Sequence, residues 1–222
     1  MKRVAVLIAV ALACTWAWTK HSKAVNERAL ATVASRLACK PVHVHCQSWL
    51  GQLVDVSDHS GYVQFDRSGR PRAKTSLTWS VCGLLHRFKT NATHPEIDCL
   101  LTVDWSRWSY AGDAAGPCEQ RAWQTAQAIT TLTHESMHMR GWTNEATAQC
   151  YAIQEDAWTV MRLGGSLAEG RAVAAFVLAR QPGMPGEYQS ADCRRGGELD
   201  LHPETVDFPT EETPGLPAAP VR

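Results

Sequence analysis

Two histidines lie four residues apart in the segment His134-Glu135-Ser136-Met137-His138. On an α-helix, residues with this spacing share one face, so both imidazoles can bind one metal ion. Zinc accepts neutral imidazole nitrogens and, in catalytic sites, keeps one position open for a water whose pKa it lowers to about 7. Glu135 projects toward that position, where its carboxylate can accept the water's proton and pass it to a leaving amine. The motif therefore predicts a Zn²⁺ site with His134 and His138 as ligands and Glu135 as the general acid/base.

A third ligand is expected from the segment that follows the motif. Gly141 predicts the end of the helix and a reversal of the chain, so that the next helix runs antiparallel to the first. With a rise of 1.5 Å per residue, the two histidines lie about 5–10 Å back from the turn, level with residues 145–149. Glu145 fits this level and faces inward with Gln149, its neighbour one turn along. It is the predicted third ligand of a His₂Glu site.

Other polar residues compete with Glu145 for this position. Glu155 and Asp156 lie about 15 Å along the second helix and fit worse. Asn144 is adjacent, but a neutral amide is a weak zinc ligand, and this residue or Thr143 can cap the second helix instead.

The stretch from about residue 134 to 150 resembles the zincin metallopeptidases, with its HExxH motif, its glycine turn and an acid from the following helix. Gly141 stands where the metzincin pattern H-E-x-x-H-x-x-G-x-x-H has its glycine, whereas Asn144 occupies the place of the last histidine. The likeness is closer to compact gluzincin-like enzymes. The sequence HESMHMRGWTNEATAQCYAIQ is also similar to exported actinobacterial proteins that share the cysteines and the LDLHP element. This resemblance implies a zinc hydrolase scaffold and supplies no substrate.

Three helices are predicted for the half of the chain that carries the motif. Residues 118–140 contain no Gly or Pro, and a second helix is expected from residue 143 or 144 to about Leu163. Alanines at 146, 148 and 152 keep this second helix slim, so that it can approach the first closely. A third helix is predicted over residues 166–180, before Pro182-Gly183.

The preceding half mixes helix and strand signals. Residues 24–38 have helical spacing, with Val25, Leu30, Val33 and Leu37 on one side, and residues 77–88 predict a short helix. Strands are predicted from residue 42, over residues 61–66 and over residues 97–105. The predicted fold is α+β, with a small N-terminal sheet packed on a helical C-terminal half.

Composition limits the classes of protein that this chain can belong to. Its 222 residues carry 22 Lys and Arg against 22 Asp and Glu, which excludes a strong basic footprint for nucleic acid. With 45% hydrophobic and 20% charged residues, it is neither a disordered nor a multispan membrane protein. We expect one zincin-like domain over residues 25–202, preceded by a targeting segment over residues 1–24 and followed by a Pro-rich, acidic, flexible tail over residues 203–222.

The N-terminus predicts export. Lys2 and Arg3 precede an apolar run over residues 4–18, which is shorter than the roughly 20 residues of a membrane-spanning helix and suits a signal peptide. Ser22-Lys23-Ala24 supplies a cleavage site. An uncleaved anchor that holds the chain at the membrane through residues 4–18, or a lipoprotein modified at Cys14, is the alternative. Each places the remaining chain outside the cytoplasm, secreted or in the cell envelope.

Seven cysteines follow that segment, and none forms a CxxC pair. In an oxidising compartment, scattered cysteines usually form disulfides, so three bridges and one free thiol are expected. Cys39 and Cys46 are close enough to close a small loop. The antiparallel helix pair places Cys118 and Cys150 roughly 15–20 Å apart, which argues against a bridge between them.

Several further residues are weaker candidates. His43 and His45 alternate on a strand, where a polar face is the simpler explanation. Met184 occupies a downstream position like that of a metzincin Met-turn, and residues 61–66 could be an edge strand that binds an extended peptide. The residues that could stabilise an oxyanion are Tyr110, Tyr151, Tyr188 and Arg140.

The leading prediction is an exported zinc-dependent hydrolase, a metallopeptidase acting on a peptide or protein substrate. The alternative is a disulfide-stabilised envelope protein that acts by binding or as a structural component, with a non-catalytic metal site. Such a closed site would need a fourth protein ligand, for example His202 or a cysteine.

Overall fold

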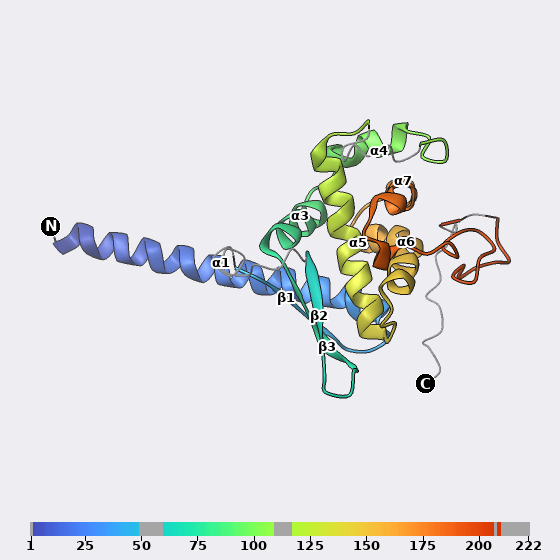
Figure 1. Cartoon of the computed structure of the whole chain (residues 1–222). Coiled ribbons are helices and arrows are strands. Elements are labelled where there is room, and N and C mark those ends of the chain that lie inside the picture. The colour runs from blue at the N-terminus through green and yellow to red at the C-terminus, as the bar shows by residue number, and fades with distance from the viewer. Residues whose placement is uncertain (1, 49–59, 109–116, 207, 210–222) are drawn as a thin grey trace.

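A computed structural model describes the backbone of residues 2–48, 60–108, 117–206 and 208–209, and the side chains from residue 20 onward within these ranges. This part of the chain is α+β, with one small sheet in its N-terminal half and a helical C-terminal half, as predicted (Figure 1). Its helices are α1 (Lys2–Leu37), α3 (Trp79–Thr90), α4 (Asp98–Thr102), α5 (Gln120–Arg140), α6 (Glu145–Arg162) and α7 (Leu167–Arg180).

The sheet has three strands in the order β1-β3-β2. Strand β1 (His43–Cys46) pairs in parallel with β3 (Pro71–Leu77), and β2 (Gly61–Phe65) pairs with β3 antiparallel. Strands β1 and β2 confirm the strands predicted from residue 42 and over residues 61–66, whereas β3, the central strand, has no counterpart in the prediction. Residues 72–74 are all exposed and the buried end includes Thr75 and Ser76, so β3 lacks the alternation of apolar and polar residues that identifies a strand.

The predicted helix over residues 24–38 is the end of α1, which begins at Lys2. Leu30, Val33 and Leu37 are buried as expected, whereas Val25 is 43% exposed. The N-terminal part of α1 extends away from the rest of the chain (Figure 1). Among the described residues, no helix is long and apolar enough to cross a membrane. The side chains of residues 4–18, which include Cys14, lie outside the described side chains, so the export segment stays a prediction.

Residues 97–105 do not form the predicted strand. Ile97 ends a 3₁₀ turn (Pro95–Ile97), and the short helix α4 begins at the next residue. Pro95 occupies the first position of this turn, where its fixed φ angle and missing N–H favour a helix start. Ile97 and Leu100, one helical turn apart, are both buried, and the indole N–H of Trp105 donates to the Leu100 carbonyl at 2.9 Å. A short apolar run is compatible with either structure, and tertiary packing selects the helix.

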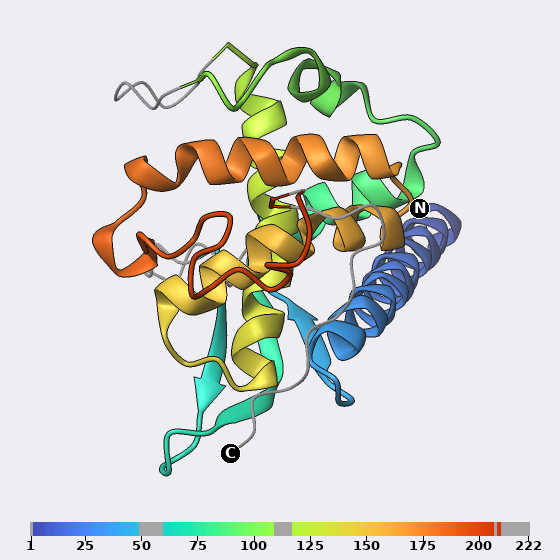
Figure 2. The same ribbon diagram turned by 90° about the vertical axis from the view of Figure 1, so that its right-hand side faces the viewer.

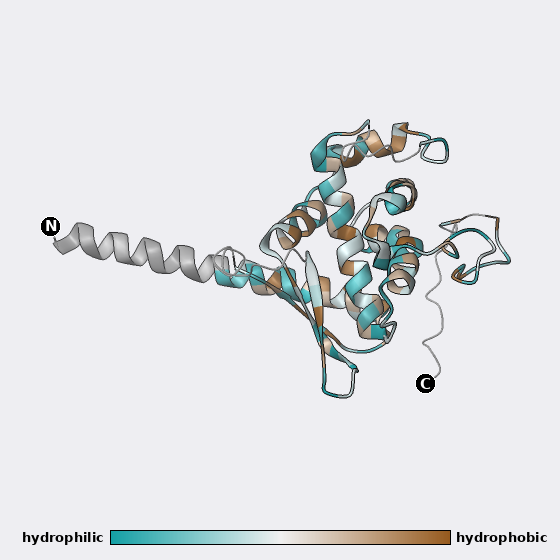
Figure 3. Cartoon of the chain, in the orientation of Figure 1, coloured by the Kyte–Doolittle hydropathy of each residue, from teal (hydrophilic) through white to brown (hydrophobic). Residues whose placement is uncertain are grey.

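Helix α5 lies at the centre of the molecule. It contacts β2 and β3 on one side and α6 and α7 on another, and Figure 2 shows α6 and α7 crossing it. Although it is buried for most of its length, it carries polar as well as apolar residues (Figure 3). Thr131, Thr133 and Ser136 donate their hydroxyls to backbone carbonyls four residues earlier. These internal hydrogen bonds offset the cost of burying the hydroxyls.

Small residues allow the C-terminal helices to approach closely. Ala148 and Ala152 of α6 are fully buried, as the slim helix of the sequence analysis requires. A Cβ atom on Gly170 of α7 would lie 2.7 Å from the Cα of Ala157, closer than a real contact allows. The α6–α7 packing therefore depends on glycine at position 170.

Three disulfides join Cys46 to Cys82, Cys99 to Cys118 and Cys150 to Cys193, and the remaining described cysteine, Cys39, is free and exposed. The expected count of three bridges and one free thiol is confirmed, and so is the absence of a Cys118–Cys150 bridge. The expected small loop between Cys39 and Cys46 is wrong. The buried face of β1 includes Cys46, which bonds to Cys82 on α3, whereas Cys39 lies on the surface before the strand. The bridges indicate an oxidising, extracytoplasmic environment.

Between α5 and α6 lies a fully buried carboxyl group, that of Asp156. The Thr130 hydroxyl donates to its Oδ2 at 2.6 Å. Burial raises the pKa of Asp156 to about 8, against the opposing effect of hydrogen bonds from Thr130 and Thr133. The folded protein thus holds this carboxyl protonated at a pH where the unfolded chain ionises it.

We therefore expect Asp156→Asn to change how stability depends on pH. In the wild type, this carboxyl contributes fully to the free energy of unfolding below its pKa in the unfolded chain, near 3.8. The contribution is lost as the pH rises through its pKa in the folded protein, about 8. The free energy of unfolding of the variant, minus that of the wild type, should increase with pH across this window. The increase should be up to about 1.4 kcal/mol per pH unit. Urea unfolding at pH 4, 6 and 8 with the disulfides intact measures the difference, and a difference independent of pH would contradict the assignment.

Candidate metal centre

The turn between α5 and α6 sets the geometry of the site. Gly141 follows the last residue of α5 with a φ angle of 126°, a backbone conformation that side-chain-bearing residues rarely adopt. Its N–H donates back to the His138 carbonyl at 2.9 Å. Asn144 caps α6 by accepting the Thr147 N–H at 2.9 Å, the role considered for it in the sequence. Glu145 is then the first residue of α6 and faces the last two turns of α5.

The structure brings together His134, His138 and Glu145. One carboxylate oxygen of Glu145 (Oε2) lies 3.0 Å from Nε2 of His134 and 3.1 Å from Nε2 of His138. One ligand atom from each of the three residues lies within 4.8 Å of the others. Ligands bonded to a tetrahedral zinc ion at 2.0–2.2 Å are about 3.3 Å apart, which is close to these separations.

The protonation pattern of His138 also suits a cation. Its Nδ1 lies 2.7 Å from the backbone carbonyl of Trp142, which can only accept, so Nδ1 carries a proton. In the neutral imidazole, Nε2 then presents a lone pair toward the Glu145 carboxylate, which also presents lone pairs. A proton or a metal ion must lie between these two atoms. A hydrogen bond from the second nitrogen to a carbonyl is typical of histidines that bind metals.

Electrostatics favours the forms of these side chains that bind metal. Burial lowers the pKa of His134, against the opposing effect of the hydrogen bond with Glu145, and so keeps its imidazole neutral. The hydrogen bond with His134 lowers the pKa of the Glu145 carboxyl, which therefore stays ionised. A neutral imidazole and an ionised carboxylate are ligands that suit Zn²⁺.

Glu135 lies on the next face of α5, at the wall of a pocket of about 190 Å³. It is 5% exposed, and its Oε2 has no hydrogen-bond partner in the described part of the chain. Burial, and to a lesser extent the charge of Glu145, raises its pKa to about 8. A buried carboxylate without a partner is costly, and such groups concentrate at functional sites.

Strand β2 packs tightly against this glutamate. A Cβ atom on Gly61 would lie 2.8 Å from Cδ2 of Leu77, 3.0 Å from Cγ2 of Thr131 and 3.1 Å from Cγ of Glu135. Glycine at this position lets the start of the strand approach α5 beside Glu135. The strand therefore forms one wall of the pocket.

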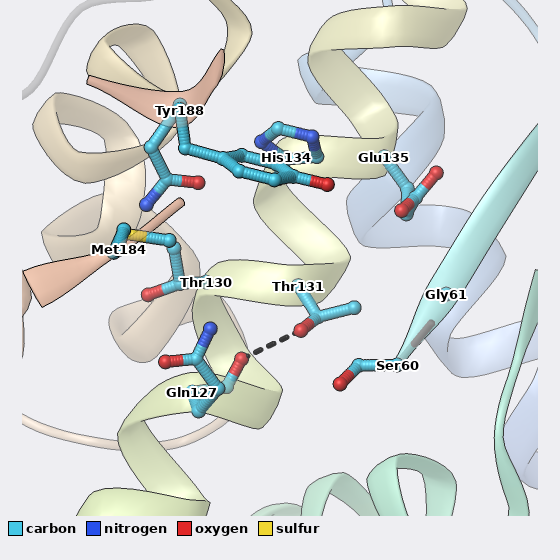
Figure 4. Close-up of a pocket in the computed structure, with 10 residues that line it drawn as sticks. Ser60, Gly61, Gln127, Thr130, Thr131, His134, Glu135, Met184 and Tyr188 are labelled. Carbon is cyan, nitrogen blue, oxygen red and sulfur yellow. Dashed lines mark hydrogen bonds between the residues drawn. The ribbon is translucent and has the colours of Figure 1, made fainter. Parts of the chain in front are cut away.

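The opposite wall comes from the segment after α7. Tyr188 and Met184 line the pocket together with His134, Glu135 and Gln149 (Figure 4). The Tyr188 ring lies 5.7 Å from the His134 ring, and its hydroxyl points toward the side on which Glu135 lies. Burial raises the pKa of Tyr188, and the charges of Glu145 and Glu135 add to this effect, so the hydroxyl keeps its proton. Sequence reasoning named Tyr188 without selecting it, because no local signal places residue 188 beside residue 134.

The other oxyanion candidates face elsewhere. Tyr151 packs edge-on against Trp142, at 4.9 Å between ring centroids. Arg140 is buried and donates to the Leu37 carbonyl at 3.2 Å. Tyr110 lies outside the described residues.

The weaker metal-ligand candidates also lie apart from the cluster. Asp156 bonds to Thr130, and His43 and His45 are exposed on β1, with His45 3.3 Å from Glu27. His202 lies 3.3 Å from Glu204.

Comparison of the chain with protein-family models, curated proteins and solved structures finds no match.

Zinc should stabilise the folded protein through the three clustered residues. At a free concentration 100 times its dissociation constant, a ligand adds about 2.7 kcal/mol, which raises the melting temperature of a domain this size by roughly 5–10 °C. Calorimetric melting with and without zinc should show this shift in the wild type, a smaller one in Glu145→Gln and none in His134→Ala. His45→Ala is the control and should behave like the wild type. A full shift in His134→Ala would place the metal elsewhere.

Proposed function

We propose that this protein is an exported zinc-dependent hydrolase of the zincin type, acting on peptide bonds. The observation that carries the proposal is the convergence of three potential metal ligands, one of which, His134, lines a pocket together with Glu135. The Oε2 atom of Glu135 has no hydrogen-bond partner among the described residues. The disulfides support a location outside the cytoplasm. The finer placement, secreted or held in the envelope through residues 4–18, belongs to the proposal.

Each residue of the metal cluster and the adjoining pocket has a defined task in this reaction. When bound by His134, His138 and Glu145, zinc supplies a Lewis acid that polarises a carbonyl and lowers the pKa of water. The Glu135 carboxylate accepts a proton from the attacking water and delivers it to the leaving amine. A cation held by these three residues would favour the ionised form of the Glu135 carboxyl, the form that acts as a base. The Tyr188 hydroxyl donates a hydrogen bond to the oxyanion that develops on the substrate carbonyl.

A peptide substrate is supported by the position of β2. This strand lies at one end of the sheet order, so one of its edges is unpaired in the described part of the chain. Its first residue, Gly61, lines the pocket with Ser60. An extended peptide could pair with this edge through backbone hydrogen bonds and pass its scissile bond beside Glu135.

The alternative is a non-catalytic metal site in an envelope binding or structural protein. A closed zinc site has four protein ligands, and the cluster found among the described residues has three. The sources considered for a fourth ligand do not join this cluster: His202 lies 3.3 Å from Glu204, and six cysteines form disulfides. The free Cys39 is not part of the cluster either. Three protein ligands favour an open, catalytic position.

Replacing Glu135 by glutamine separates metal binding from catalysis. The amide preserves shape but cannot accept a proton, so we expect zinc content to stay at the wild-type level while kcat falls by about 100-fold or more. Hydrolysis of a casein-derived peptide mixture, followed by mass spectrometry, measures the loss. Unchanged cleavage by the zinc-loaded variant would sink the catalytic role.

Removing the Tyr188 hydroxyl tests the oxyanion assignment. Tyr188→Phe should lower kcat by about 100-fold, the typical effect of losing one oxyanion donor, with little change in KM or zinc content. Tyr151→Phe removes a hydroxyl from a tyrosine outside the pocket and should keep wild-type kinetics. Equal effects of the two substitutions would show that Tyr188 acts only through packing.

A further inference from the structure

A second, larger cavity adjoins the pocket that contains Glu135. Its volume is about 430 Å³, compared with about 190 Å³ for the pocket, and it lies between α3 and the N-terminal half of α5. Ser60 and Gln127 line both, so the two cavities are neighbours. We call this cavity the α3–α5 groove. None of the residues placed in the catalytic machinery lines it.

Among the described residues, the charged side chains that line the α3–α5 groove are both positive. Arg87 from α3 and Arg121 from α5 line it, and no Asp or Glu among the described residues does. Neither guanidinium forms an ion pair within the described part of the chain, in a protein whose formal net charge is zero. Guanidinium groups recognise carboxylates through two parallel hydrogen bonds. Two guanidinium groups without an ion-pair partner in one groove therefore favour an anionic ligand.

Two tryptophans give the groove an aromatic lining. Trp79 is 57% exposed, which is unusual for so large an apolar side chain. Trp123 also lines the groove, and its indole N–H is buried without an acceptor among the described residues. Leu84 and Ala128 complete an apolar lining. Such a surface suits an acidic side chain, whose methylene groups pack on the rings while its carboxylate meets the arginines.

The distance from the metal site sets where on a substrate this side chain would lie. On α5, Gln127 and Arg121 precede His134 by seven and thirteen residues, or about 10 and 20 Å at 1.5 Å per residue. An extended peptide covers about 3.3 Å per residue. If the scissile bond of an extended peptide lies beside Glu135, the residues of that peptide three to six positions away lie at the groove.

We propose that the α3–α5 groove is a specificity subsite that binds an acidic side chain of the peptide substrate, three to six residues from the scissile bond. The inference rests on the proposed function, because it assigns the groove to the same substrate. It predicts that acidic peptides are preferred over neutral ones of the same shape. The preference resides in Arg87 and Arg121, outside the catalytic machinery.

Binding is tested first, on a protein that does not need to cleave. Fluorescein-labelled hexaglutamate and hexaglutamine are titrated with the full-length, zinc-loaded Glu135→Gln protein, and fluorescence polarisation reports binding. We expect hexaglutamate to bind about 5- to 10-fold more tightly, and this preference to vanish when Arg87→Gln and Arg121→Gln are added. The matched control, Arg36→Gln with Arg195→Gln, removes the same charge elsewhere on the surface and should keep the preference. Equal binding of the two peptides, or an equal loss in the control, overturns the subsite.

Cleavage then locates the acidic position. The wild type and the Arg87→Gln/Arg121→Gln protein digest a proteome-derived peptide library, and mass spectrometry reads the residues on both sides of each cut. Asp and Glu should be enriched three to six residues from the cut by the wild type only. Cleavage without this enrichment overturns the subsite and leaves the hydrolase proposal intact. An absence of cleavage, together with an arginine-dependent preference for hexaglutamate, would instead contradict the hydrolase proposal and support an acidic ligand for the groove.

Discussion

The site depends on the turn of the chain at Gly141, after which α6 crosses α5 (Figure 2) in place of the antiparallel pairing expected from the sequence. The positive φ angle of this glycine and the Asn144 cap together fix where α6 begins. As a result, one oxygen of Glu145 lies within about 3 Å of both motif imidazoles. Because α5 is packed between the sheet and the other C-terminal helices, the histidines have little freedom to move away from this carboxylate. The arrangement concentrates three lone-pair donors at one point, which is stable only with a proton or a cation among them.

The opposite side of the pocket is held by covalent and polar links to α6. The Cys150–Cys193 disulfide fixes the segment that carries Met184 and Tyr188, which contains no α-helix or strand. Gln154 adds two hydrogen bonds to this segment, donating to the Leu199 carbonyl and accepting from the Leu201 N–H, both at 2.8 Å. Helix α6 thus positions both the Glu145 carboxylate and the tyrosine opposite. The oxidising environment indicated by the disulfides is therefore a condition for the geometry of the site.

Local periodicity made the motif and its third member accessible from sequence. The four-residue spacing of the histidines and the helix stop at Gly141 are local signals, and helix rise alone placed Glu145 level with the motif. Non-local contacts were not accessible in this way. Strand β3 pairs at the centre of the sheet but has a polar sequence. Residues 98–102 fold as a helix because Ile97 and Leu100 become buried. Cys46 of β1 forms a disulfide with Cys82 of α3, 36 residues along the chain. Tyr188 lies 54 residues after His134 in the sequence, and only the fold brings the two rings together.

The central claim is that His134, His138 and Glu145 hold a zinc ion with one open position. X-ray absorption spectroscopy of the zinc-loaded protein tests it most directly, because it reports the number, type and distance of the ligands. The account predicts two imidazole nitrogens and carboxylate and water oxygens, all at about 2.0–2.2 Å, with one light ligand that exchanges when a small inhibitor binds. A sulfur ligand near 2.3 Å, or four protein ligands without an exchangeable one, would contradict it.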